Sequence, residues 1–364
     1  MQVPFIDFDY ELKELKQDYK NLLQMHIKNG DFIGGSNVKR FEKNLANYLN
    51  IKHVISVGNG TDALIISLLA LNLQKKEVIV PAFSFFATSE AVVQAGLRPV
   101  FVDIESNTCN IDISKIEANI TEKTGAILPV HLFGNPVNMY KLKKISSKYD
   151  LKIVEDVAQS FGSKWGSKYL GTIGDIGCFS FFPTKTLGAY GDGGAIVTNE
   201  IRYAEKAELL KNHGAKTKYF NEIFGFNSRL DSIQASILDL KLQKIDSWIK
   251  SRVEIGNYYD KNLNKINEIQ LLNNNYSTYN YYSMLIKNNK RDELKTFLNS
   301  KNIASAIYYP TPLPSLPAHN IKKSFKTAEQ VSREIISIPI WPKMNVVQIN
   351  YVIDSIYEFF KQYK

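Results

Sequence analysis

From about residue 53 to residue 199, short apolar segments alternate with longer amphipathic segments. Such alternation is typical of parallel β-strands joined by crossover helices. The pattern predicts seven strands, at residues 53–57, 77–80, 99–103, 126–131, 152–155, 178–182 and 195–198. It predicts helices at residues 62–71, 84–95, 113–118 and 139–148, each flanked by Gly, Pro, Asn or Asp. We therefore expect an α/β fold in which helices cover both faces of one mostly parallel seven-stranded sheet.

The regular alternation ends near Asn199, where a second pattern begins. A helical stretch at residues 231–249 leads into a region rich in Asn, Lys and Tyr. Strands at residues 281–286 and 334–338, with a helix at residues 292–299, predict a compact α+β unit. We expect a large domain over residues 1–245 and a smaller C-terminal domain over residues 246–364, on which residues 1–15 can pack. The proline-rich segment from Tyr309 to Pro317 should be an ordered loop at the surface or at an active site.

The composition is that of an ordinary globular protein, with 44% hydrophobic and 22% charged residues in a chain of 364. The net charge is +9 and the isoelectric point is about 9.1, which suits either a nucleic acid or a small anionic ligand. The basic residues are spread along the whole chain, and no nucleic-acid-binding module is recognisable. We expect a solvated lysine-rich surface and no nucleic-acid partner, while a phosphate-bearing ligand is compatible with the charge.

The first residues, Met1-Gln-Val-Pro-Phe-Ile-Asp7, contain no basic segment followed by an apolar one. No stretch approaches the ~18 consecutive apolar residues that a membrane helix needs. We therefore expect a cytoplasmic protein with no membrane partner. Of the two cysteines, Cys109 and Cys178, the second lies in an apolar run, so a packing role is favoured over a disulfide.

Polar residues that follow the predicted strands are candidates for chemistry, because open parallel sheets bind ligands at the carboxyl ends of their strands. The first strand is followed by Gly58-Asn-Gly60-Thr61-Asp62, a glycine-rich turn that opens a predicted helix. Free backbone N–H groups and the helix dipole can bind a phosphate there. Thr61 or Asp62 could equally act as a plain helix N-cap, so this turn alone does not decide between the two roles.

Two carboxylates, Glu155 and Asp156, stand at the end of the strand predicted at residues 152–155. A buried carboxylate is unfavourable unless it meets a cation, and a protonated pyridine nitrogen is one such cation. Asp156 could instead cap the next helix or pair with a basic side chain. Taken without their context, these residues favour that alternative.

Lys185 lies in a loop between two predicted strands and is bracketed by aromatic residues and glycines. Exclusion of water would favour the neutral amine, which is a nucleophile for a carbonyl carbon, although a lone loop lysine is usually solvated. Phe85 and Phe86 follow another strand, where one ring could stack on a flat heteroaromatic ring or simply pack in the core. A phosphate site, a stacking ring, a buried carboxylate and a desolvated lysine are together what pyridoxal 5'-phosphate (PLP) requires.

These residues resemble the sugar aminotransferases of the DegT/DnrJ/EryC1/StrS family, which have the aspartate-aminotransferase-like PLP fold (fold type I). The resemblance extends from Val3 to Pro339 and therefore covers nearly the whole chain. The matching segments are Gly60-Thr-Asp-Ala-Leu64, Glu77-Val-Ile-Val-Pro81, Pro129-Val-His-Leu-Phe-Gly134, Glu155-Asp-Val-Ala-Gln159, Phe179-Ser-Phe181, Pro183-Thr-Lys185, Gly225-Phe-Asn-Ser-Arg-Leu-Asp231 and Tyr309-Pro310.

The resemblance implies a role for each of four residues around the cofactor ring. Lys185 would bind PLP as a Schiff base, and Asp156 would pair with the pyridine nitrogen N1. Gln159 would contact the ring oxygen O3', and Phe85 would lie on the ring face. Lys185 is also implied to be the catalytic residue.

The resemblance further implies that Gly60, Thr61 and Ser180 hold the cofactor phosphate. In such enzymes an asparagine of a Gly-x-Asn-x-Arg motif reaches that phosphate from the neighbouring subunit. Asn227 occupies this position here, which implies a homodimer with shared active sites.

The activity implied is transfer of an amino group from L-glutamate to a nucleotide-linked keto-sugar, with pyridoxamine 5'-phosphate formed between the two halves. The amine of Lys185 would move the proton between substrate and cofactor carbons. The sugar dehydratases of the family carry histidine at the position of Lys185, so dehydration is disfavoured. No metal is expected.

The substrate is expected to be a dTDP-linked 3-keto-6-deoxyhexose, aminated at C3 to give a dTDP-3-amino-3,6-dideoxyhexose. The segments Leu187-Gly-Ala-Tyr-Gly-Asp-Gly-Gly-Ala195 and Gly225-Phe-Asn-Ser-Arg-Leu-Asp231 look more like the C3 enzymes, whereas C4 enzymes more often have Gly-Glu-Gly-Gly and Asn-Tyr-Arg there. Amination at C4 is the alternative. A catalytically silent PLP-binding regulator is a third possibility, but such regulators usually carry a DNA-binding module, and the sequence has no segment to spare for one.

Four residues are expected to contact the substrate. Lys218 and Tyr219 belong to a basic stretch that could bind the nucleotide diphosphate, although an exposed basic loop explains that stretch equally well. Tyr308 stands where relatives often have histidine, and it precedes Tyr309 at the expected sugar site. His131 is expected to be a hydrogen-bonding residue at a strand end, not a catalyst.

Overall fold

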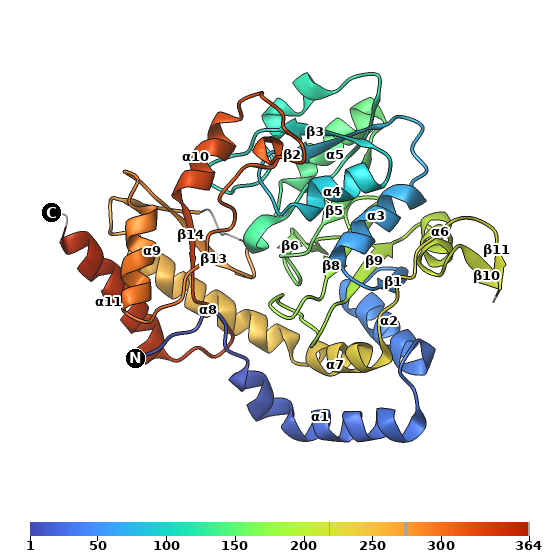
Figure 1. The fold of residues 1–364 in the computed structure, drawn as a ribbon, viewed down its shortest axis with the longest axis horizontal. Helices are drawn as coiled ribbons and strands as arrows, with labels where there is room; N and C mark the ends of the chain where they lie inside the picture. Colours follow the sequence, from blue (N-terminus) through green and yellow to red (C-terminus); the bar gives the residue numbers. More distant parts are fainter. Residues whose placement is uncertain (218, 273–275, 363–364) are drawn as a thin grey trace.

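The computed structural model describes residues 1–217, 219–272 and 276–362 of the chain. Its central sheet has seven strands in the order β1-β9-β8-β5-β4-β2-β3 (Figure 1). The strands are β1 (His53–Val57), β2 (Glu77–Pro81), β3 (Arg98–Val102), β4 (Thr124–Ile127), β5 (Lys152–Asp156), β8 (Ile176–Ser180) and β9 (Gly194–Thr198). Neighbours from β8 to β3 are parallel, and β9 is antiparallel to both β1 and β8. The mostly parallel seven-stranded sheet predicted from the sequence is confirmed.

The largest difference from the predicted strand ends is at β4. β4 stops at Ile127, whereas the apolar pattern extended it to His131. Pro129 has no N–H group with which to continue the ladder, so the chain leaves the regular strand before it. Val130 then makes only an isolated bridge with Asp156.

Helices cover both faces of this sheet, as expected. They are α1 (Asp9–Asn29), α2 (Gly35–Leu49), α3 (Gly60–Ala70), α4 (Ala87–Gln94), α5 (Met139–Tyr149), α6 (Ile201–Lys211) and α7 (Ser232–Leu242). Along β2, Ile79 packs into one hydrophobic cluster with residues of α2, α5 and α7. Val78 and Val80 pack into a second cluster with residues of α3, α4 and α6. This alternation is what a strand buried on both faces requires.

Two predicted helices take a different form. Residues 113–118 fold as two short 3₁₀ turns, Ile113–Lys115 and Glu117–Asn119, in place of one α-helix. The stretch predicted at residues 231–249 is divided into α7 and α8 (Ile245–Leu263), with a break at Gln243 and Lys244. Helix α8 then runs well beyond the predicted end.

A second, smaller sheet follows α8. It contains β12 (Ile269–Leu271), β13 (Tyr282–Ile286) and β14 (Ile335–Ile338), all antiparallel, with helices α9 (Arg291–Ser300), α10 (Lys326–Glu334) and α11 (Val346–Lys361). Val3 makes a bridge with Ile303, so the N-terminal segment joins this α+β unit, and both chain ends lie there (Figure 1). The exact division of the chain at residue 246 stays a prediction.

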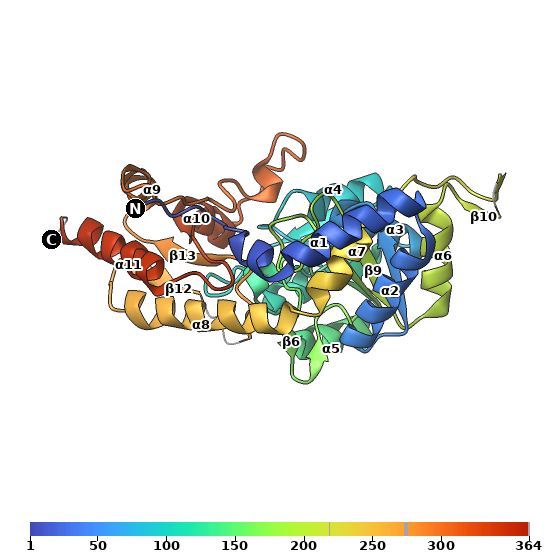
Figure 2. The ribbon, with the colours of Figure 1, turned by 90° about the horizontal axis from the view of Figure 1, so that it is seen from below.

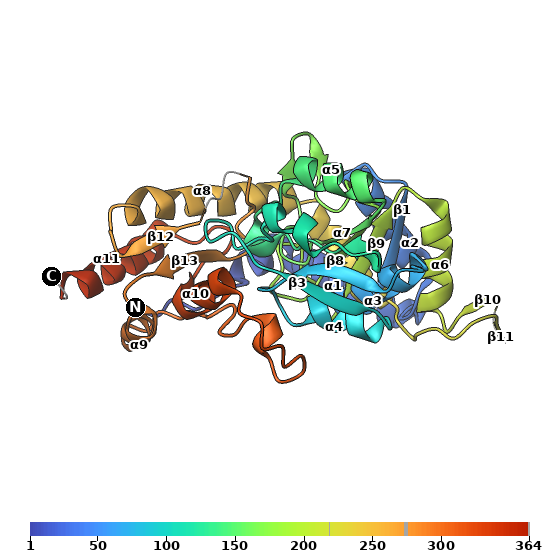
Figure 3. The ribbon, with the colours of Figure 1, turned by 90° about the horizontal axis from the view of Figure 1, so that it is seen from above.

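Two hairpins project from the main sheet. The first consists of β6 (Lys164–Trp165) and β7 (Lys168–Tyr169), and the second of β10 (Ala215–Thr217) and β11 (Phe220–Asn221). The second extends away from the body at the end opposite the α+β unit (Figures 2 and 3). Both cysteines are free and buried, as packing residues should be. None of the helices in the described part of the chain combines the length and apolar character needed to cross a membrane.

A buried ion pair attaches α1 to the loop that contains Lys185. Glu11 of α1 pairs with Lys241 of α7, with 2.6 Å between Oε2 and Nζ, and both side chains are almost fully buried. Lys241 also donates a hydrogen bond to the Gly188 carbonyl at 2.7 Å, and the Tyr190 hydroxyl donates to Glu11 at 2.6 Å. Helices α1 and α7 therefore hold the backbone of this loop in place.

We predict that Glu11→Gln destabilises the protein by about 3–5 kcal/mol, because it leaves the ammonium of Lys241 buried without a counter-charge. Urea unfolding followed by far-UV circular dichroism measures the change. Asp9→Asn is the matched control on the same helix, since Asp9 pairs with Lys13 at the exposed surface and should leave the unfolding curve close to that of the wild type. Equal effects of the two substitutions would contradict the role given to the buried pair.

Candidate active site

A cavity of about 700 Å³ lies at the carboxyl ends of the central strands. Most of the predicted site residues line it, namely Gly60, Thr61, Phe85, Asp156, Gln159, Ser180, Lys185, Tyr308 and Tyr309. They come from segments far apart in sequence, including the α3 N-terminus, the β8 end and the proline-rich loop. That loop is ordered and at the site, as its composition predicted. The residues that the strand-end rule for open parallel sheets singled out therefore meet at one edge of the sheet.

Asp156 ends β5 and is buried. Its Oδ1 accepts a hydrogen bond from the Ala158 N–H, and its Oδ2 accepts one from the Thr88 hydroxyl, both at 3.1 Å. Burial raises the pKa of Asp156, and these hydrogen bonds together with the charge of Lys185 act in the opposite direction. No basic side chain in the described part of the chain forms an ion pair with Asp156, and the residues after it form turns, not a helix. Neither alternative drawn from the local sequence is observed, so this carboxylate can still receive a cation from a ligand.

The adjacent carboxylate, Glu155, has a separate structural role. It accepts hydrogen bonds from His131 Nε2 at 3.0 Å and from three backbone N–H groups, of Gly171, Ile173 and Gly174. Although burial alone would raise it, these donors hold the pKa of Glu155 below its ordinary value. His131 Nδ1 accepts from the Val137 N–H, so the ring proton lies on Nε2. His131 is thus a strand-end hydrogen-bonding residue, as its position suggested.

The N-terminus of α3 forms an anion cradle. The Asn59 side chain caps the helix by accepting from the Asp62 N–H at 2.8 Å, and the Asn59 carbonyl accepts from Ala63. Within the described chain, the N–H groups of Gly60 and Thr61 are left without an acceptor. A β-carbon on Gly60 would lie 2.7 Å from Cβ of Ser180, so only glycine permits this close approach to the end of β8. Two free N–H groups, a helix dipole and a serine hydroxyl suit a phosphate.

Lys185 lies in the loop after β8, where its side chain is partly exposed in the single chain. Its Nζ lies 5.9 Å from the centroid of the Tyr281 ring. The following residue, Thr186, donates its N–H to Asn280 Oδ1 at 2.9 Å, so the α+β unit also holds this loop. The desolvation expected around Lys185 is therefore only partial within one chain.

Gln159 and the aromatic residues form the remaining walls. The amide oxygen of Gln159 accepts from the Phe133 N–H, and its amide nitrogen donates to the Tyr309 hydroxyl, both at 2.9 Å. The second amide hydrogen of Gln159 can still donate to a ligand oxygen. The Phe85 ring is half exposed and lies 5.8 Å from the Tyr309 ring. Burial raises the pKa of Tyr308 to about 12, so this phenol is neutral at physiological pH.

Two of the remaining predicted residues do not line this cavity. Tyr219 is 88% exposed in the turn of the β10–β11 hairpin, and Asn227 is exposed where it bridges to Asn212. Lys218 lies outside the described residues. The cross-subunit role of Asn227 therefore stays a prediction.

Sequence reasoning missed several cavity residues, including Ser84, Asp192 and Tyr281. Tyr281 directly precedes β13 of the α+β unit and carries no local signal of a site. Among the described residues that line the cavity, Lys185 is the one cationic side chain, whereas Asp62, Asp156 and Asp192 are carboxylates. The cavity of a single chain thus lacks the positive charge that a strongly anionic substrate needs.

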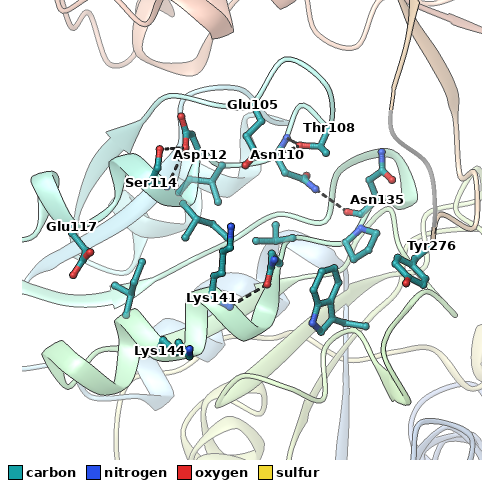
Figure 4. A pocket seen from close by; sticks show the side chains of 17 residues that line it. Glu105, Thr108, Asn110, Asp112, Ser114, Glu117, Asn135, Lys141, Lys144 and Tyr276 are labelled. Atoms are coloured by element: carbon teal, nitrogen blue, oxygen red, sulfur yellow. Dashed lines mark hydrogen bonds between the residues drawn. The ribbon is translucent and has the colours of Figure 1, made fainter.

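A second cavity of about 680 Å³ lies between α5 and residues 105–114 (Figure 4). It contains none of the predicted site residues. Asp112 binds the Ser114 hydroxyl and pairs with Lys115, and the Asn110 amide binds backbone groups. These polar side chains therefore serve the local fold.

The residues of the first cavity fit PLP. The cradle at Gly60 suits a phosphate, Phe85 offers an exposed ring face, and Asp156 is a buried carboxylate without an ionic partner in the described chain. Gln159 has a hydrogen to donate to a ring oxygen, and Lys185 is the amine that could bond an aldehyde.

Comparison with known proteins agrees with this assignment. The model of the DegT/DnrJ/EryC1/StrS aminotransferase family matches residues 13–357. The chain is 39% identical to a "pleiotropic regulatory protein" of Geobacillus stearothermophilus over the full length of both. It is 36% identical to a UDP-N-acetyl-3-dehydro-α-D-glucosamine 3-aminotransferase of Acidithiobacillus ferrooxidans, over 95% of each chain. A dTDP-3-amino-3,6-dideoxy-α-D-galactopyranose transaminase of Aneurinibacillus thermoaerophilus is 35% identical, over 97% of this chain and 98% of the other.

The fold is also that of solved aminotransferases. The crystal structure of Streptomyces venezuelae DesV in complex with a ketimine intermediate superposes with a TM-score of 0.94, at 33% identity and 98% coverage of each chain. The aspartate-aminotransferase-like fold expected from the resemblance is therefore confirmed.

We predict that Gly60→Ala weakens PLP binding at least about tenfold, because the added methyl group pushes the start of α3 away from Ser180. Titration of cofactor-free protein with PLP, followed by absorbance, measures the affinity. Ser180→Ala should have a smaller effect, since it removes one donor and leaves both N–H groups in place. Wild-type affinity in a correctly folded Gly60→Ala variant would show that the phosphate is bound elsewhere.

Proposed function

Because the chain belongs to the DegT/DnrJ/EryC1/StrS family and is a PLP-dependent sugar aminotransferase, we propose that it moves the amino group of L-glutamate to C3 of a dTDP-linked 3-keto-6-deoxyhexose. The observation that carries the chemistry is that Lys185 and Asp156 line one cavity, which the α3 anion cradle borders. Two relatives are named for an amino group at C3 of their own sugars, which are dTDP-linked in one case and UDP-linked in the other, and this supports the same position here. The product would be a dTDP-3-amino-3,6-dideoxyhexose.

Besides Asp156, Lys185 and the neighbouring chain's Asn227, five residues would hold the cofactor. Gly60, Thr61 and Ser180 would bind its phosphate through N–H groups and a hydroxyl. Phe85 would lie against the ring face, and Gln159 would donate to the ring oxygen O3'.

Asp156 and Lys185 would act directly in the reaction. When bound, PLP supplies an electron sink that stabilises negative charge on the carbon that loses a proton. Asp156 would keep a proton on the ring nitrogen, since a buried carboxylate gains most from a facing cation. Lys185 would bond the cofactor aldehyde at rest and, once free, would take a proton from glutamate Cα at Nζ. In the second half-reaction the same amine would deliver a proton to C3 of the sugar.

The substrate site would extend from these residues to Tyr308 and Tyr309. Tyr308 contacts the rings of Phe5 and Tyr281, with centroid distances of 5.9 Å and 4.7 Å. These rings form an apolar wall with phenol groups, which suits a deoxysugar that has both a methyl group and hydroxyls. Tyr219, which is exposed in the single chain, would approach the nucleotide from a second subunit.

We also propose that the active unit is a homodimer with shared sites. A phosphate, a nucleotide diphosphate and glutamate are all anionic, yet the cavity of one chain has a single cation, Lys185, among its described lining. Apolar side chains are exposed on α1 and near the β10–β11 hairpin, including Leu12, Ile27 and Phe224. Exposed apolar surface of this kind marks an interface, and a second copy of the chain is the proposed occupant.

We predict that purified protein with glutamate aminates a dTDP-3-keto-6-deoxyhexose faster than the 4-keto isomer by at least about tenfold. NMR of the product locates the nitrogen, and a UDP-linked 3-keto-sugar tests the nucleotide. Lys185→Ala should lower the rate at least about 100-fold, whereas Lys141→Ala, which removes an exposed lysine of the second cavity, should not. Nitrogen at C4, or a fully active Lys185→Ala, would overturn the proposal.

We predict that Lys185→Ala and Asn227→Ala complement each other in a heterodimer. If Asn227 serves the neighbouring chain, one of the two sites has both residues intact, and the heterodimer regains about half of the wild-type activity. Differently tagged chains allow that heterodimer to be purified and assayed. Each homodimer should be strongly impaired. An inactive heterodimer would place Asn227 at its own chain's site.

A further inference from the structure

Two hydroxyl groups form a hydrogen-bonded chain that ends on Asp156. Ser84 Oγ and Thr88 Oγ1 are 2.8 Å apart, and Thr88 Oγ1 lies 3.1 Å from Asp156 Oδ2. Ser84, in the turn before α4, and Thr88, in its first turn, are both almost fully buried. Ser84 lines the cavity, whereas Thr88 does not.

The direction of this chain follows from the number of hydrogens. An ionised carboxylate only accepts hydrogen bonds, so Thr88 must use its single hydroxyl hydrogen on Asp156. Thr88 can then only accept from Ser84. All donors point toward the carboxylate, and each bond in such a chain polarises the next.

The arrangement favours the charged form of Asp156 and fixes its plane. Donors to a carboxylate favour its ionised form, which opposes the effect of burial at this site. The terminal torsion of an aspartate is otherwise broad. Here Ala158 holds one oxygen and Thr88 holds the other, so the carboxylate cannot turn.

Other ionisable groups lie near enough to this carboxylate to interact with it electrostatically. They are Lys185 in the loop after β8, His131 in the segment that follows β4, and Tyr309 in the proline-rich loop. Cys178 lies on the neighbouring strand β8. None of them forms one of the two hydrogen bonds to Asp156, so the hydroxyl chain is a separate influence on it.

We propose that Thr88 is a positioning residue that keeps Asp156 ionised and turned toward the cofactor ring nitrogen, with Ser84 orienting Thr88. Thr88 does not line the cavity, and it acts only through Asp156. The inference rests on the proposed role of Asp156. It assigns α4 a function in the chemistry beyond covering the sheet.

The test is ¹⁵N NMR of the dimeric protein loaded with PLP labelled at N1, recorded as a function of pH. In Thr88→Val the ring nitrogen should lose its proton at a pH lower by roughly one to two units than in the wild type, because a less ionised Asp156 stabilises the pyridinium less. Thr88→Ser, which keeps the hydroxyl, should restore the wild-type transition. Steady-state kinetics of Thr88→Val should show a lower kcat with little change in the KM for the sugar.

Three further variants make the outcome decisive. Ser89→Ala is the matched control in α4. The buried Ser89 hydroxyl contacts Phe86 and His319, so its removal should leave the pH at which the ring nitrogen loses its proton unchanged. If Asp156→Asn shifts the pH at which the ring nitrogen loses its proton and Thr88→Val does not, the positioning role of Thr88 is overturned. If Asp156→Asn does not shift this pH, the proposed role of Asp156 itself is contradicted. If Thr88→Val does not fold, Ser84→Ala takes its place in the test. A smaller shift of this pH in the same direction supports the hydrogen-bonded chain of hydroxyls, and no shift refutes it.

Discussion

A buried carboxylate without an ionic partner in the described chain is the constraint around which this site is built. Asp156 lies at the end of a strand that is covered on both faces, where a negative charge is unfavourable unless a cation meets it. The fold supplies hydrogen bonds from Ala158 and Thr88 and leaves the cavity side open. A protonated ring nitrogen would complete the arrangement, and cofactor binding and the ionisation of this carboxylate would then depend on each other.

The other elements place the remaining residues proposed to contact the cofactor in the same cavity as that carboxylate. The N-terminus of α3 approaches β8 so closely that residue 60 must be glycine, which puts the proposed phosphate site beside the end of β8. The loop of Lys185 is held from two directions, by the buried Glu11–Lys241 pair and by Asn280 of the α+β unit. A reactive amine needs such support, because a small misplacement lowers the rate of proton transfer. The positive charge missing from the cavity is what a second subunit would add.

Much of this could be predicted from the sequence, because the signals are local. Alternating apolar segments gave all seven strands, and strand ends pointed to Gly60, Asp156 and Lys185, whose roles the family resemblance made specific. The errors arose where a local pattern was overruled, as at Pro129, which ends β4 early, and at residues 243–244, which divide a long amphipathic stretch. Helices α1 and α2, before the regular alternation, were not predicted. The role proposed for Thr88 was not predicted either, because it depends on the contact of α4 with the end of β5.

The most direct test of the central claim is the absorbance of the purified protein. If Lys185 and Asp156 bind PLP as described, the protein should show a band near ~400–430 nm that moves toward ~330 nm when L-glutamate is added, and returns when a keto-sugar acceptor follows. A correctly folded protein that shows no such band after incubation with PLP would contradict the account.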